Sequence, residues 1–233
     1  MPFPRRILRL VALLAGVVAA PAASGGGDVD LASSRVYVFV GKKGLGHDHA
    51  VSGSLQAGSI RLDAGEQAGT LVFDMRSFRA DTADARRALG LPGETDPGTQ
   101  RQVTENMLGP DVLDVARHPA ATLEIRSALP ATRAVAPGRR AYDLAGVFTL
   151  HGVSRPVVIP AEVERIGAID RLSGGFAIRQ TDFGMRPYTK LGGVVGVADE
   201  LRIYGDIRVA AAGAPAAPPS AAVAPPPAAG VVR

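Results

Sequence analysis

The residues most able to do chemistry are two histidines, His47 and His49, in the glycine-flanked stretch GLGHDHAVSG. Side chains two residues apart on an extended strand point to the same side, so both imidazoles could face one metal ion. A catalytic zinc site usually has three protein ligands, however, and this pair supplies two. The alternative is a polar loop between two strands, in which Gly44, Gly46 and Gly53 allow tight turns.

A third ligand would have to come from elsewhere in the chain. The candidates are His118, His151, Asp48 and Asp182. Only the fold can bring one of them to the histidine pair, so the spacing alone is weak evidence for a metal. The sequence leaves a metal-binding enzyme and a polar loop as open interpretations and favours the loop.

Other motifs with catalytic associations lack their partners. TDFGMRP contains the Asp-Phe-Gly of protein kinases, but the sequence has no glycine-rich phosphate loop, strand lysine or His-Arg-Asp loop to accompany it. GKKGLG lacks the Gly-Lys-Ser/Thr of a phosphate-binding loop. With no Gly-x-Ser-x-Gly elbow and no cysteine, nucleophilic catalysis and thiolate metal sites have no support. We predict a protein that is not an enzyme and has no cofactor.

The net charge of +4 is a property of the chain ends. Four of the 26 basic residues, Arg5, Arg6, Arg9 and Arg233, lie outside residues 28–209, whereas all 22 acidic residues lie inside. This central part therefore carries no net charge and offers no basic stripe for a phosphate backbone. We predict that the protein does not bind nucleic acid.

Both ends of the chain differ in composition from its centre. Residues 1–23 combine three arginines, an apolar run over 10–20 and the small residues AAPAAS, the pattern of a secretory signal peptide. The run is too short for a comfortable membrane span, so we expect a periplasmic or secreted protein with no stable span after cleavage. Residues 210–233 are rich in Ala and Pro and are predicted to be a disordered tail.

Between these ends, apolar and polar residues alternate with a period of two, as in TLVFDM, ATLEIRSA, GGFAIRQ and ELRIYGDIRVA. This pattern is typical of half-buried antiparallel strands. Further strands are expected at 35–41, 50–56, 59–62, 142–150 and 157–164, with AGS at 57–59 as a turn. One stretch breaks the pattern, with helices predicted at 82–90, capped by Asp81 or Thr82, and at 99–113.

So many half-apolar strands must bury one face, and closure into a barrel does this while removing the sheet edges. We predict an all-β fold, an antiparallel barrel of about eight strands with a helical insertion. A barrel of this size is either filled by side chains or holds one small ligand. With few aromatic residues and many glycines in or beside the strands, the composition leaves a filled core and an apolar tunnel equally open.

The order of motifs resembles the YceI-like family of exported bacterial proteins over most of residues 33–209. The resemblance is carried by YVFVGKKGLGHDHAVSGSLQAGSIRLD, LVFDMRSFRADT, MLGPDVLDVARHPAATLEIRS, GVFTLHGVSRPVVIP and FAIRQTDFGMRPYTKLGGVVGVADELRIYGDIRV. It implies an extended lipocalin-like antiparallel β-barrel spanning residues 28–209. It also implies a lipid partner, because some members bind a polyisoprenoid chain inside the barrel.

The resemblance and the strand faces together suggest which residues would line such a tunnel. They are Val38, Val40, Leu71, Phe73, Leu123, Phe148, Phe176, Phe183 and Ile203. Lys42, Lys43, His47 and His49 belong to one hairpin loop and are expected at the rim, where they could meet a polar head group. The expected function is enclosure of a polyisoprenoid or other long apolar chain. The alternatives are a metal-binding enzyme that uses the histidine pair and a filled barrel that binds a protein partner.

Overall fold

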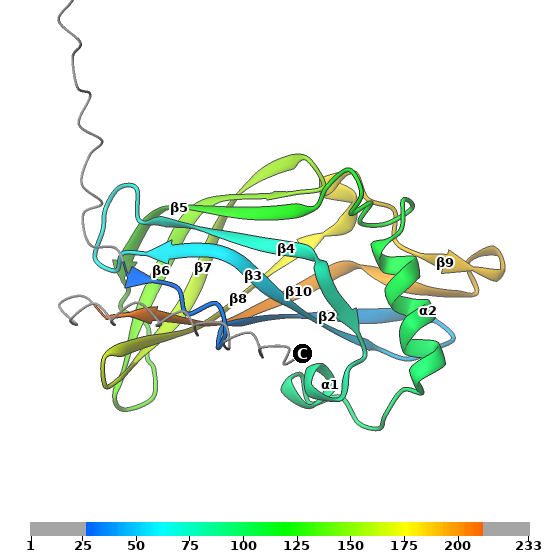
Figure 1. Cartoon of the computed structure of the whole chain (residues 1–233), viewed down its shortest axis with the longest axis horizontal. Helices are drawn as coiled ribbons and strands as arrows, with labels where there is room; N and C mark the ends of the chain where they lie inside the picture. The colour runs from blue at the N-terminus through cyan, green and yellow to red at the C-terminus, as the bar shows by residue number, and fades with distance from the viewer. Residues whose placement is uncertain (1–26, 212–233) are drawn as a thin grey trace, which may run out of the picture.

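The structure, a computed structural model, describes residues 27–211 (Figure 1). The predicted signal peptide and the predicted tail beyond Ala211 lie outside the described residues. The barrel strands are β2 (Arg35–Gly44), β3 (His49–Ile60), β4 (Gly69–Ala80), β5 (Ala120–Pro130), β6 (Arg139–Leu150), β7 (Val153–Ile166), β8 (Ile169–Arg179) and β10 (Val195–Ala210). The other elements are β1 (Gly27–Asp28), β9 (Thr189–Lys190), the helices α1 (Ala83–Ala88) and α2 (Pro97–Leu108), and the 3-10 helices η1 (Gln180–Phe183) and η2 (Leu191–Gly193).

The strands form one closed antiparallel barrel, which confirms the predicted fold class. Their order is β3-β2-β10-β8-β7-β6-β5-β4, and a further pairing of β4 with β3 completes the ring of eight. Closure leaves no long sheet edge exposed, which removes a template for aggregation. Among the described residues, no helix is long and apolar enough to cross a membrane.

The two ends of the barrel are built differently. One end, here called the open end, carries the β2–β3 turn, the insertion between β4 and β5 with α1 and α2, and the segment between β8 and β10 with β9 (right in Figure 1). The other, here called the closed end, carries β1 and short connections such as residues 167–168 between β7 and β8. Every long insertion in the barrel therefore lies at the open end.

The closed half of the barrel is filled with side chains. Ile60, Ile125, Tyr142, Val163 and Val209 are almost wholly buried there. The Tyr142 hydroxyl donates a hydrogen bond of 2.9 Å to Oδ1 of Asp63, so the polar tip of this large side chain is satisfied. Close packing of this kind is typical of protein interiors and stabilises the closed half of the barrel.

The two helices are defined by their first residues. Thr82 caps α1 by accepting a hydrogen bond from the Ala85 amide, and Asp96 caps α2, which has Pro97 at its first position. Helix α2 ends at Leu108, so the predicted helix over 99–113 is too long at its C-terminal end.

The predicted turn at 57–59 is wrong. Strand β3 continues from His49 to Ile60 and absorbs the irregularity as a shift of register against β4 between Leu55 and Ala57. A bulge of this kind bends a strand without ending it, and barrels use such bends to close. The small residues of AGS thus mark a bend in one long strand.

Candidate functional site

The open half of the barrel contains a cavity of about 430 Å³. Its wall consists mostly of apolar side chains from the barrel strands, and it reaches the loops of the open end. A volume of this size is typical of sites that hold a small molecule or part of a chain-like ligand. This cavity argues against a barrel filled throughout, one of the possibilities raised by the sequence.

Seven of the nine predicted tunnel residues line this cavity: Val38, Val40, Phe73, Leu123, Phe148, Phe176 and Ile203. Phe148 is at the centre of the aromatic part, with ring centroids 6.4 Å from Phe73 and 5.4 Å from Phe176, both edge to face. Edge-to-face contacts are a favoured arrangement of aromatic rings. The aromatic wall of the cavity is therefore one packed cluster of rings.

The other two predicted tunnel residues do not line it. Leu71 is buried opposite Leu123 in the β4–β5 pairing, but unlike Leu123 it does not line the cavity. Phe183 comes from η1 and packs against Phe148 at 5.8 Å between ring centroids, behind the cavity wall. Both belong to the packing that supports the cavity.

One wall of the cavity was not predicted from the sequence. It is formed by α2 and the chain after it, through Gln102, Val103, Asn106, Met107, Val112 and Leu113. The Ala80 amide donates to Thr104 Oγ1 at 3.0 Å and the Gln100 side chain donates to the Asp81 carbonyl, which hold α2 against the end of β4. Composition identifies the helix, but the surface that it covers is decided by the fold.

The predicted rim residues separate into two groups. His47 and His49 line the mouth of the cavity, together with Lys190 and Tyr188 from the segment before β10. Lys42 and Lys43 do not line the cavity, and the expectation that they belong to the hairpin loop is wrong. Both are exposed near the end of strand β2, where they pair with Val197 and Gly196 of β10.

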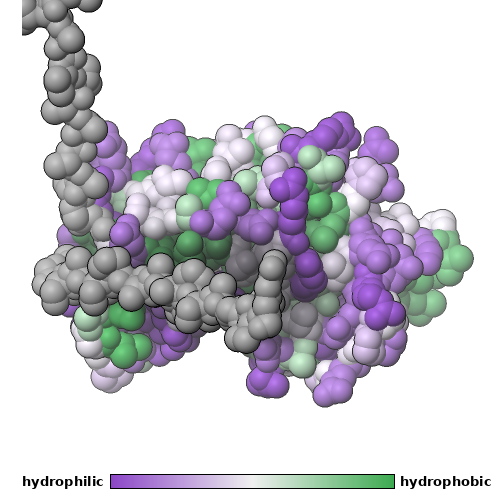
Figure 2. Space-filling model, in the orientation of Figure 1, coloured by the Kyte–Doolittle hydropathy of each residue, from purple (hydrophilic) through white to green (hydrophobic). Residues whose placement is uncertain are grey.

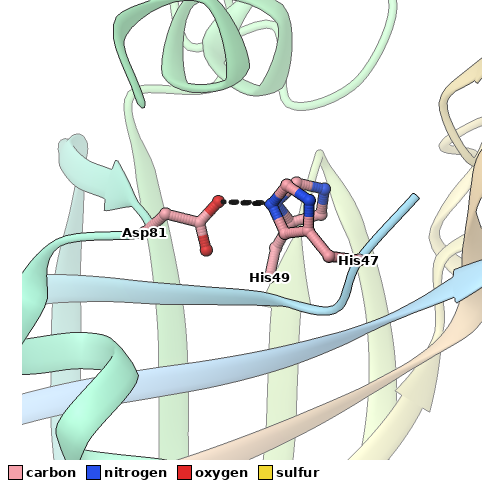
Figure 3. Close-up of side chains that lie close together, drawn as sticks. All are labelled: His47, His49 and Asp81. Atoms are coloured by element: carbon pink, nitrogen blue, oxygen red, sulfur yellow. Dashed lines mark hydrogen bonds and ion pairs between the residues drawn. The ribbon is translucent and has the colours of Figure 1, made fainter. Parts of the chain in front are cut away.

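His47 and His49 are brought together with a third residue, Asp81 (Figure 3). Nδ1 of His49 lies 2.6 Å from Oδ2 of Asp81, and Nε2 of His47 lies 3.6 Å from the same oxygen. The carboxylate accepts the His49 hydrogen bond, so Nδ1 carries the proton there. The two imidazole rings are 4.5 Å apart between centroids.

Asp81 is wholly buried and held from several sides. Its Oδ1 accepts hydrogen bonds from the Ala50 amide at 3.0 Å and from Arg86 Nη1 at 3.1 Å. Burial raises the pKa of the Asp81 carboxyl, but the hydrogen bonds from His49, Ala50 and Arg86 outweigh burial, and the pKa lies below its ordinary value. The residue is therefore a fixed carboxylate beside the cavity mouth.

Arg86 connects this carboxylate to two loops. Besides Asp81 it donates to the backbone carbonyls of Asp48, Pro92 and Gly93. A guanidinium with several fixed acceptors is an effective clamp for irregular backbone. The cluster thus orders the turn that carries His47 as well as the loop after α1.

The residues that the sequence offered as a third metal ligand do not lie with His47 and His49. His118 and His151 form a second pair with ring centroids 4.3 Å apart. Asp48 accepts a hydrogen bond from the Lys42 amide, and Asp182 lies in η1. Among residues 27–211, His47, His49 and Asp81 are the group of three whose ligand atoms lie within 4.8 Å of one another.

From the sequence, Asp81 was predicted only as a possible helix cap. The structure gives that role to Thr82 and turns Asp81 inward with a positive φ of 54°. Aspartate tolerates this backbone region better than most residues do. The only sequence feature that marks Asp81 is its position between the end of a strand and a helix cap. This feature does not connect Asp81 with the histidines.

Comparisons with known proteins agree with this architecture. The family profile of the YceI-like domain matches residues 28–209, whereas a search of curated proteins gives no match. BcnA of Burkholderia cenocepacia is similar in structure, with a TM-score of 0.54 and 21% identity over 78% of this chain and 99% of that one. A polyisoprenoid binding domain from Saccharophagus degradans, implicated in plant cell wall breakdown, has a TM-score of 0.53 and 16% identity over 80% of this chain and 98% of that one. The closed barrel, its helical insertion and the profile match over the whole barrel thus establish that this chain belongs to the YceI-like domain family.

Proposed function

We propose that the protein is an exported, non-enzymatic carrier that encloses the chain of a polyisoprenoid or another long apolar lipid in its barrel. The observation that carries the proposal is the apolar cavity of about 430 Å³ in the open half, with polar side chains at its mouth. Apolar walls with a few polar groups at one end match a ligand with a long tail and a small head.

The energy of the proposed complex comes from the tail. Each methylene moved from water to the cavity contributes about 0.8 kcal/mol, so ten of them supply roughly 8 kcal/mol before the costs of association. Phe73, Phe148 and Phe176 present a packed aromatic surface to such a tail. A preformed wall reduces the ordering cost of binding.

The head group is assigned to the mouth of the cavity. His47 and His49 lie there, and Asp81 holds the His49 ring through its Nδ1, which leaves the Nε2 of His49 free for a ligand. Asn106 and Tyr188 line the same region and hydrogen-bond to each other at 3.4 Å. These groups can donate to and accept from a hydroxyl, carbonyl or phosphate oxygen.

Two further observations support the proposal. The described fold is similar to that of a protein named as a polyisoprenoid binding domain. Residues 1–23 have the pattern of a secretory signal peptide, which fits a carrier that works outside the cytoplasm.

The test is native mass spectrometry of protein recovered from the periplasm of an expressing bacterium. We expect an added mass that matches a prenyl or acyl lipid. Phe148→Glu should abolish it because the new charge would lie in the apolar wall, whereas Phe39→Glu should keep it, since Phe39 stacks with Arg202 outside the cavity.

A second pair of variants guards against loss of folding in Phe148→Glu. Leu201→Trp adds bulk to the cavity without charge, and Tyr204→Trp makes a similar addition on the exposed face of the same strand. Loss of the lipid in the first variant only is the expected result. A bare polypeptide mass for the unmodified protein and for all four variants would contradict the proposed function.

A second candidate function is the binding of a divalent transition metal, which the addition of Asp81 to the histidine pair favours. Two tetrahedral ligands at the usual 2.0–2.1 Å from zinc are about 3.3 Å apart, so His49 and Asp81 would have to separate from their 2.6 Å contact. The positive charge of Arg86 on the same carboxylate also opposes a cation. Equilibrium dialysis with zinc chloride tests this candidate, which requires one bound ion that is lost in His49→Ala and kept in His118→Ala.

A further inference from the structure

The open end carries an exposed apolar tip. Leu45 in the β2–β3 turn is 67% exposed, and Leu191 and Val194 in the hairpin before β10 are 75% and 53% exposed. The two segments are joined, because the Leu45 amide donates to the Val194 carbonyl at 3.0 Å. Three large apolar side chains from two loops thus form one projecting surface, here called the apolar tip.

The apolar tip differs from the other exposed apolar residues. Leu129 lies in β5, and Val158 and Ile166 lie at different points along β7. Single exposures of this kind are ordinary on protein surfaces. Figure 2 shows green hydrophobic surface at the right-hand end of the molecule, where Figure 1 places the hairpin of β9. Grouped exposure of this type usually marks a surface that contacts an apolar partner.

The charge around the apolar tip has one sign. Residues 41–47 contain Lys42 and Lys43, and residues 186–198 contain Arg186 and Lys190, with no acidic residue in either segment. The nearest acidic residues in the chain are Asp48, whose side chain accepts from the Lys42 amide, and Asp199, whose side chain is bound to Thr181. Residues 28–209 have equal numbers of basic and acidic residues, so outside these two segments the acidic residues outnumber the basic ones and the concentration of cations is local.

The apolar tip is continuous with the cavity. Leu45, Lys190 and Val195 line the cavity mouth while they or their neighbours project from the end of the barrel. A lipid that entered beside the apolar tip would pass from one apolar surface to another. A tip of this composition, cations around exposed leucines, matches the interfacial region of a bilayer, where apolar side chains insert and basic ones meet anionic head groups.

We propose that the apolar tip docks on the surface of an anionic phospholipid bilayer and places the cavity mouth against the membrane. The purpose of docking rests on the proposed lipid-carrying function. A second copy of the chain fits less well, since facing tips would repel through their lysines, and three side chains offer far less area than the roughly 800 Å² per partner of a stable interface.

The sharpest test uses the absence of tryptophan from the chain. Leu191→Trp places one fluorophore on the apolar tip, and Ile166→Trp, in a strand that ends at the closed end and 52% exposed in the native protein, is the matched control. With vesicles of phosphatidylcholine and phosphatidylglycerol at 7:3, we expect a blue shift of emission for Leu191→Trp and none for Ile166→Trp. No shift at residue 191, or an equal shift at both residues, would overturn the proposal.

Vesicle flotation of protein without tryptophan gives an independent readout. The double variant Lys42→Gln/Lys43→Gln should bind the same vesicles about thirtyfold more weakly, since each basic residue near an anionic surface is worth about 1 kcal/mol. Leu45→Ser/Leu191→Ser should reduce flotation, whereas Ile166→Ser should not. Equal flotation of all variants, or undiminished flotation with phosphatidylcholine alone, would contradict docking by this tip.

Mass spectrometry of the same samples separates this inference from the proposed function. Lys42→Gln/Lys43→Gln, which changes no residue that lines the cavity, should keep its bound lipid while it floats more weakly, and this result supports both. Protein that binds vesicles through residue 191 yet never carries a lipid would contradict the carrier function and leave the docking surface standing. Protein that carries a lipid but binds no vesicles would contradict the docking surface and leave the carrier function standing.

Discussion

The two ends of the barrel use the same strands for different purposes. At the closed end, Ile125, Tyr142 and Val163 fill the interior, and ion pairs such as Arg165 with Asp170 cover the outside. At the open end the same strands surround a cavity, and order comes from a buried polar cluster centred on Asp81. One end is stabilised mainly by apolar packing and the other by hydrogen bonds that leave the interior free.

This difference explains how a barrel can be both stable and hollow. An unfilled cavity forgoes the dispersion contacts of its wall, so the remainder of the domain must supply the stability. A barrel with long strands can concentrate packing in one half and still place every strand on the cavity in the other.

The largest effect is expected at the polar cluster. Asp81→Asn removes the charge that faces Arg86, and an unpaired buried guanidinium should lower the free energy of unfolding by about 3–5 kcal/mol. Urea denaturation measures the loss. The double variant Asp81→Asn/Arg86→Met should regain part of it, since no uncompensated charge remains, and a double variant as unstable as the single one would argue against the ion pair as the cause.

Matched truncations compare the two ends directly. Ile125→Ala at the closed end should cost about 2–5 kcal/mol, because it opens a void in a filled core. Ile203→Ala lies on the cavity wall, where the side chain already faces open volume, and should cost less than about half as much. Denaturation midpoints of the two variants provide the measurement, and equal losses would mean that the ends are packed alike.

Acid should weaken the open end through Asp81. Its pKa is lower in the folded protein than in the unfolded chain, so its contribution is present above an unfolded pKa of about 3.9 and is lost as the pH falls through the folded pKa. The stability gap between the native protein and Asp81→Asn should therefore narrow below about pH 4. Urea titrations at pH 7 and pH 3 measure it, and an unchanged gap would exclude this linkage.

The smallest effect concerns the closed end in alkali. Burial, and then the hydrogen bond to Asp63, raise the pKa of Tyr142, so the neutral form is favoured in the fold and stability should fall as the pH rises past about 10. Tyr142→Phe should cost about 1 kcal/mol at pH 7 through the lost hydrogen bond. The same variant should lose less stability than the native protein between pH 9 and pH 11, and parallel profiles would place the alkaline loss elsewhere.

Much of the barrel was predictable because alternation is a local property. Leu201, Ile203, Ile207 and Val209 face inward along β10 as the period of two requires. Alternation does not show which of the inward-facing residues line the cavity. Leu71 and Phe73 share one face of β4, yet only Phe73 lines the cavity.

The candidate site was predictable only in part, for a related reason. His47 and His49 are neighbours in sequence, and their spacing suggested a shared site. Asp81 is more than thirty residues from either of them, and no local pattern links a residue between a strand and a helix to a distant turn. The β3–β4 pairing, in which Val51 faces Ala80, is what brings it to His49.

The sequence by itself determined the strands, the closed barrel and its family, because these follow from side-chain alternation and the order of motifs along the chain. The tertiary structure alone decided that one half is filled and the other hollow, that α2 forms a wall of the cavity, and that Asp81 joins the histidines. Each of these depends on which residues meet across the barrel, and contacts between distant segments are set by packing in three dimensions rather than by neighbours in the chain.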